Sequence, residues 1–83
     1  MAAKEQEVSI LEPYLDEEIT IITGDLATGY KSTTGRLKKD NGYYLRQITD
    51  CDIINHPIVW SEVAVLLYHG ERAYDIQAQK QGT

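Results

Sequence analysis

The hydrophobic pattern indicates that most of this chain forms β-strands. Ile19 to Thr23 is β-branched throughout, and a stretch rich in threonine and basic residues runs from Tyr30 to Lys39. Val63 to His69 is almost entirely apolar, so we expect this strand to be buried on both faces. The five expected strands are Ile19–Thr23, Tyr30–Lys39, Tyr43–Thr49, Val63–His69 and Ala73–Gln77.

Glycine and proline mark the ends of these strands. Asp40-Asn41-Gly42 is the strongest local signal, because Asn-Gly accepts the positive φ angles of a tight hairpin turn. The strand after this turn either ends at Thr49 or continues through Cys51 to Ile54. Asn55-His56-Pro57 is expected to break it, since proline cannot donate to a β-ladder. Gly70 is expected to turn the chain into the last strand.

A short helix is expected before the first strand, within Ser9–Glu18. Ser9 and Glu12 have the spacing of a capping box, or Pro13 occupies the first helical position. The polar ends of the chain have little to bury, so residues 1–8 (an acidic segment) and 78–83 are expected to be flexible tails. The single domain then spans residues 9–77.

Length and composition limit the possible functions. A chain of 83 residues forms one small domain, too small for a deep cleft between domains. We find neither an apolar run long enough to span a membrane nor a secretion signal, and the single cysteine, Cys51, has no internal disulfide partner. These features predict a cytoplasmic protein in a reducing compartment.

Charge is distributed unevenly along the chain. The net charge of −5 argues against broad, non-specific binding of nucleic acid. Residues 1–18 carry six acidic side chains and one lysine, whereas residues 31–46 carry five basic side chains and one aspartate. If the basic stretch is a hairpin, its charge is concentrated on a small surface, although a solubilising strand face would have the same pattern.

The expected fold is mainly β: a short N-terminal helix followed by a strongly bent, open barrel of five strands. Such a barrel leaves two strand edges unpaired, and proteins blunt, cover or pair such edges. The apolar strand Val63–His69 is expected near one edge. Pairing that edge with a neighbouring copy, repeated head to tail, would close a homo-oligomeric ring.

The order of these elements resembles the Sm-like family, which includes Hfq-like proteins and whose members form rings that bind RNA. The second family motif is matched by Val65 to Ile76, where Gly70 falls on the family glycine and His69 on the base-contacting arginine. The first motif is matched by Gly35-Arg36-Leu37 and then Asp40. Its stacking aromatic falls on Gly42 and its asparagine on Tyr44, which are departures from the family pattern.

The resemblance implies a site for single-stranded RNA at the pore or on one face of a ring. Tyr43, Tyr44 and His69 would stack on bases, with Gly70 beside His69 and with phosphate neutralised by Lys38, Lys39 and Arg46. The expected subunit contact consists of Val63, Val65, Leu67, Tyr74 and Ile76.

A plainer interpretation stays open for each of these residues. The tyrosines beside the Asn-Gly turn are typical of cross-strand packing, and His69 is typical of a turn. The acidic N-terminal cluster would then be a solvated face, and on a ring it would confine RNA to the opposite surface. The alternative function is a small β-barrel used only for protein contacts, such as an assembly piece or a viral accessory protein.

Catalysis and cofactors are not expected. His56 and His69 are the only histidines, and Asp50-Cys51-Asp52 with His56 is a weak pattern for a metal site. Gly24 to Gly29 lacks the lysine of a phosphate-binding loop. We therefore expect a protein that is not an enzyme and binds no metal.

Overall fold

The computed structural model describes residues 2–76 and consists of one helix, two 3₁₀ turns and six strands. The N-terminal helix is α1 (Ala2–Leu11), and the 3₁₀ turns are η1 (Glu12–Tyr14) and η2 (Trp60–Glu62). The strands are β1 (Glu18–Asp25), β2 (Gly29–Lys39), β3 (Tyr43–Ile48), β4 (Ile53–Pro57), β5 (Val63–Tyr68) and β6 (Glu71–Asp75).

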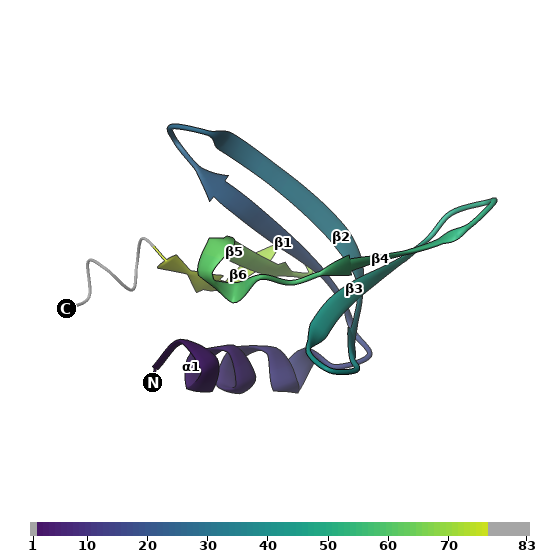
Figure 1. Cartoon of the computed structure of the whole chain (residues 1–83), viewed down its shortest axis with the longest axis horizontal. Helices are drawn as coiled ribbons and strands as arrows, with labels where there is room; N and C mark the ends of the chain where they lie inside the picture. Colours follow the sequence, from purple (N-terminus) through teal and green to yellow (C-terminus); the bar gives the residue numbers. More distant parts are fainter. Residues whose placement is uncertain (1, 77–83) are drawn as a thin grey trace.

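The six strands form one antiparallel sheet in the order β4-β3-β2-β1-β5-β6. β4 and β6 are the outer strands and do not pair with each other, so the sheet is not closed into a barrel. The prediction of a mainly β fold after a short helix is confirmed, whereas the sheet has six strands rather than the five expected for the open barrel. Figure 1 shows the β1–β2 and β3–β4 hairpins diverging from the body of the molecule.

The additional strand is β4, which includes the Asn55-His56-Pro57 segment that is expected to break the preceding strand. The preceding strand ends at Ile48, because Thr49 and Asp52 close a turn in which the Thr49 N–H donates to the Asp52 carbonyl at 2.8 Å. The Asp52 N–H donates in turn to the Thr49 hydroxyl at 3.0 Å. Pro57 is accommodated because β4 is an edge strand, where a missing donor breaks no ladder bond.

The two expected tight turns are present. Asn41 and Gly42 have φ angles of 57° and 118° between β2 and β3, as the Asn-Gly pair predicts. His69 and Gly70 have φ angles of 53° and 81°, and they form a two-residue turn between Tyr68 and Glu71.

The helix covers Ala2–Leu11 rather than the expected Ser9–Glu18, so residues assigned to the acidic tail are helical from Ala2. Ser9 does not cap a helix but donates from its hydroxyl to the Gln6 carbonyl at 3.2 Å. Leu11 anchors the end of the helix, since its side chain is fully buried in the core. The expected tail at 78–83 lies outside the described residues.

The core lies on the face of the sheet that α1 covers (Figure 1). Because strand side chains alternate between faces, Ile19 and Ile21 of β1 point to this inner face, together with Leu37 of β2. The core consists of Leu11, Ile19, Ile21, Leu37, Tyr43, Leu45, Val63, Leu66 and Tyr74. The intervening residues of each strand therefore form an outer face.

The strand β5 (Val63–Tyr68) is interior and pairs with β1 on one side and β6 on the other. The prediction that this strand offers an edge to a neighbouring copy is therefore wrong. Its apolar character has another cause, since Val63, Ala64 and Leu66 are buried within the chain itself. The open edges belong to β4 and β6.

Candidate nucleic-acid interface

Three basic side chains lie on the outer face of β2 and β3. Arg36 pairs with Arg46 across the two strands, and Lys38 pairs with Tyr44. These residues alternate with the buried Leu37 and with core residues of β3, which places all four on the face opposite the core. We call Arg36, Lys38, Tyr44 and Arg46 the basic face.

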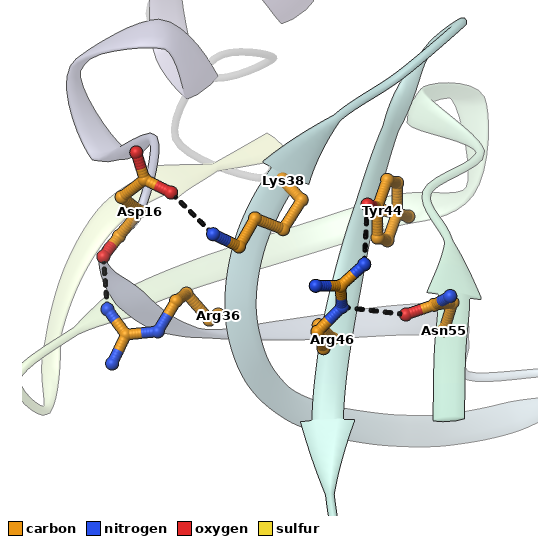
Figure 2. Close-up of polar contacts among 6 residues, drawn as sticks. All are labelled: Asp16, Arg36, Lys38, Tyr44, Arg46 and Asn55. Carbon is orange, nitrogen blue, oxygen red and sulfur yellow. Dashed lines mark hydrogen bonds and ion pairs between the residues drawn. The ribbon is translucent and has the colours of Figure 1, made fainter. Parts of the chain in front are cut away.

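Arg46 is held between its neighbours, as Figure 2 shows. Its Nη2 donates to the Tyr44 hydroxyl at 3.1 Å, and its Nε donates to Asn55 Oδ1 at 3.3 Å. The guanidinium carbon lies 5.7 Å from the centroid of the Tyr44 ring, within the range of a cation–π interaction. An aromatic ring and a fixed guanidinium, which could contact a base and a phosphate, are therefore adjacent.

Asp16 and Glu18 are acidic neighbours of the basic face, and Glu18 lies opposite Arg36 in the β1–β2 ladder. The Asp16 carboxylate accepts a hydrogen bond from Lys38 Nζ at 2.7 Å, and its backbone carbonyl accepts one from Arg36 (Figure 2). The Lys38 ammonium lowers the pKa of the Asp16 carboxyl through this hydrogen bond and through its charge. One member of the acidic N-terminal segment therefore contacts the basic stretch.

Lys39 and Tyr43 lie apart from the basic face. The Tyr43 ring is buried, and its hydroxyl donates to Glu12 Oε2 at 2.5 Å, while Lys39 Nζ donates to the same oxygen at 2.9 Å. These two hydrogen bonds, with that of Tyr43 the larger effect, lower the pKa of Glu12. Burial and the Glu12 carboxylate raise the pKa of Tyr43. Lys39 and Tyr43 therefore attach the η1 turn to the sheet through Glu12.

His69 and Gly70 occupy the β5–β6 turn. The His69 ring is exposed and meets Tyr68 edge-on, with ring centroids 4.2 Å apart. A shallow hollow on the sheet surface is lined by both turn residues and by Arg36, together with the acidic Glu17 and Glu18. His69 therefore lies at the end of the basic face rather than beside Tyr44.

Most of the residues expected at a subunit contact are packed inside the single chain. Val63 and Tyr74 are 1% and 7% exposed, and Ile76 packs against the core. Val65 and Leu67 are half-buried and point to the outer face, because they alternate with the buried Leu66.

Sequence reasoning did not assign Arg36, Asn55 or Asp16 to the site. Arg36 could have been assigned from the sequence, because it lies two residues before Lys38 on the same strand and therefore on the same face of the sheet. Asn55 and Asp16 reach the site through strand pairing and chain reversal, which no local pattern reports. Among residues 2–76, no three His, Cys, Asp or Glu side chains gather as a metal site would require.

No helix in the described part of the chain is both long enough and apolar enough to cross a membrane. Comparison with protein-family models, with curated proteins and with solved structures finds no significant match for this chain.

Proposed function

We propose that this protein binds single-stranded RNA on its basic face and does so without catalysis. The observation that carries the proposal is the row of basic side chains beside Tyr44 on one side of the β2–β3 pair. Stacking on an aromatic side chain contributes about 1–3 kcal/mol per base and is available only to unstacked bases. A single-stranded ligand is therefore favoured over a duplex.

Charge supports the same ligand in spite of the overall value of −5. Asp16 neutralises part of Lys38, whereas its contact with Arg36 is through a neutral backbone carbonyl. Arg46 donates to two neutral groups, the Tyr44 hydroxyl and the Asn55 side-chain carbonyl. Arg46 is thus the cation of the basic face with neutral partners, whereas Lys38 is paired with Asp16 and Arg36 lies opposite Glu18.

The test is a fluorescence-anisotropy titration of labelled uridine-rich and adenine-rich oligonucleotides. We expect Tyr44→Ala and Arg46→Gln to weaken binding by about tenfold each, through loss of stacking and of a phosphate contact. Lys31→Gln is the matched control, because Lys31 is an exposed cation on β2 whose position alternates to the other face. No binding at low salt, or equal weakening by Lys31→Gln, would reject this site.

A second candidate function is protein assembly without RNA. It is favoured by the apolar side chains that the β3–β4 hairpin exposes: Ile48 is 73% exposed and Ile53 is 56% exposed. Exposed apolar side chains on an open edge strand are typical of association surfaces. In this case the oligonucleotide titrations would give no signal at any salt concentration.

Membership of the Sm-like family, a ring and a cytoplasmic location stay predictions from the sequence. Because β5 is interior, a ring would have to join β4 of one copy to β6 of the next. A reducing compartment is expected since Cys51 is exposed and is the only cysteine.

A further inference from the structure

The open edge of β4 offers backbone groups that take no part in the ladder with β3. The register pairs Ile48 with Ile53 and Arg46 with Asn55 across the β3–β4 hairpin. The Ile58 N–H donates to the Tyr43 carbonyl at 3.0 Å, which identifies residues 43 and 58 as a hydrogen-bonded pair. In an antiparallel ladder such pairs alternate with pairs that are not hydrogen-bonded.

This alternation fixes which groups of β4 face outwards. Ile54 and His56 belong to the hydrogen-bonded class and use their backbone groups toward β3. Ile53, Asn55 and Pro57 belong to the other class, so their backbone groups point to the open edge. Pro57 lacks an N–H, and the Ile53 N–H donates to Asp52 Oδ1 at 2.8 Å, which leaves the Asn55 N–H and three carbonyl acceptors along this edge.

Side chains beside this edge are apolar and exposed. Ile48 and Ile53 lie opposite each other on the outer face and are 73% and 56% exposed, while Ile54 on the inner face is 40% exposed. The β4 strand contains no acidic residue, lysine or arginine. Figure 1 shows the hairpin projecting from the body, where nothing in the described chain covers it.

The other open edge is protected in the ways that natural sheets use. β6 carries Glu71, Arg72 and Asp75 within five residues. Its pairing with β5 also shifts register between Leu66 and Leu67, which is the irregularity of a β-bulge. Of these devices β4 carries only Pro57, so β4 is the less protected edge, and a contact between two β4 strands satisfies it in both copies.

We propose that two copies of this chain associate through antiparallel pairing of their β4 strands about a two-fold axis at Asn55. Asn55 would pair with Asn55 of the second copy, and Ile53 with Pro57 of the second copy. The two Asn55 residues would exchange two backbone hydrogen bonds. Each Ile53 N–H, which donates to Asp52 Oδ1 in the single copy, would exchange that acceptor for the opposite Pro57 carbonyl. The sheets of the two copies then form one continuous antiparallel sheet.

This register also covers the exposed isoleucines. On the outer face it continues the row Ile48–Ile53 with Pro57 and Tyr44 of the second copy, because Tyr44 pairs with Pro57. On the inner face Ile54 lies beside His56 of the second copy. Five residues a side bury less than the roughly 1,200 Å² of a stable complex, so we expect a dimer with a Kd of about 1–100 μM.

The dimer has a consequence for RNA that rests on the proposed function. Arg36, Arg46 and Asn55 form one row across the sheet, and the two-fold axis continues this row into the second copy. The two Arg46 residues lie three strand spacings apart, about 14 Å. One single strand would then contact both basic faces.

Sedimentation equilibrium of the full chain without RNA tests the dimer separately from RNA binding. We expect Asn55→Pro to weaken dimerisation by at least about tenfold, because it removes the central donors and no backbone bond within the chain. Asn55→Ala is the matched control, since it keeps the N–H and loses only the contact with Arg46. Ile53→Lys is expected to act like Asn55→Pro, with both variants checked for folding by circular dichroism.

Spin labels on the native Cys51 measure the geometry. The two-fold register offsets the two Cys51 positions by about eight residues, or about 25 Å along the strand. A measured mass equal to five or more chains would contradict the dimer and would indicate a ring. A monomer at millimolar concentration, or a dimer that Asn55→Pro and Ile53→Lys leave unchanged, would overturn the proposal.

Discussion

Gly35 permits the close approach of β2 and β3 beneath the basic face. It is buried, and a Cβ at this position would lie 2.8 Å from the Arg46 carbonyl oxygen and 3.2 Å from the Leu45 Cβ. The first of these distances is shorter than real Cβ contacts, and the nearest atom belongs to backbone rather than to a flexible side chain. Gly35→Ala must therefore move β3 away from β2.

Two opposing effects set the size of the change. Replacing a strand glycine by alanine contributes about 0.5–1 kcal/mol of stability through lower chain entropy. Overpacking in a core costs about 1–3 kcal/mol. Overpacking is larger here, because the Arg46 carbonyl cannot rotate away, so we expect a net loss of about 1–2 kcal/mol. In a domain of this size that lowers Tm by about 4–16 °C.

Thermal unfolding followed by circular dichroism measures this difference. Ser32→Ala is the matched control, because Ser32 is exposed on the same strand and its replacement is expected to change stability by less than about 0.5 kcal/mol. A Tm of Gly35→Ala at or above the wild-type value would show that β2 and β3 are not in this close contact.

Three further predictions concern the attachment of η1, the core and the basic face. The hydrogen bond from Tyr43 lowers the folded-state pKa of Glu12 below its ordinary 4.5. The ionised Glu12 carboxylate therefore stabilises the fold above pH 4.5, and this contribution is lost as pH falls through the folded-state pKa. Acid unfolding of Glu12→Gln should accordingly depend less on pH than acid unfolding of wild type. Leu66→Ala, at a fully buried position, should cost about 2–5 kcal/mol in urea unfolding. Asp16→Asn should tighten oligonucleotide binding severalfold and steepen its salt dependence, because it frees Lys38; unchanged binding would place Lys38 outside the site.

Local signals predicted much of the fold. The Asn41-Gly42 pair predicted the β2–β3 hairpin, because few other residue pairs accept two positive φ angles. The β-branched run from Ile19 and the apolar run from Val63 correspond to β1 and β5. Pro57 led to the wrong prediction of a break. A proline excludes a strand only at a position where a backbone donor is required, and local sequence does not show that β4 is an edge strand.

The site was less predictable because it depends on strand parity and pairing. Lys38 and Lys39 are neighbours in sequence, yet alternation sends them to opposite sides, where they meet Asp16 and Glu12. Apolar content alone could not place Val63–Tyr68 inside the sheet rather than at its edge. That placement follows from long-range pairing with β1.

The most direct test of RNA binding is a ¹⁵N–¹H correlation spectrum recorded while an unlabelled oligouridylate is added to the labelled chain. We predict that the amide signals of Arg36, Lys38, Tyr44 and Arg46 shift together and saturate, while those of α1 and of Lys31 stay in place. No shift, or shifts confined to α1, η1 and β6, would contradict the assignment of the outer face of β2 and β3 as the RNA-binding surface.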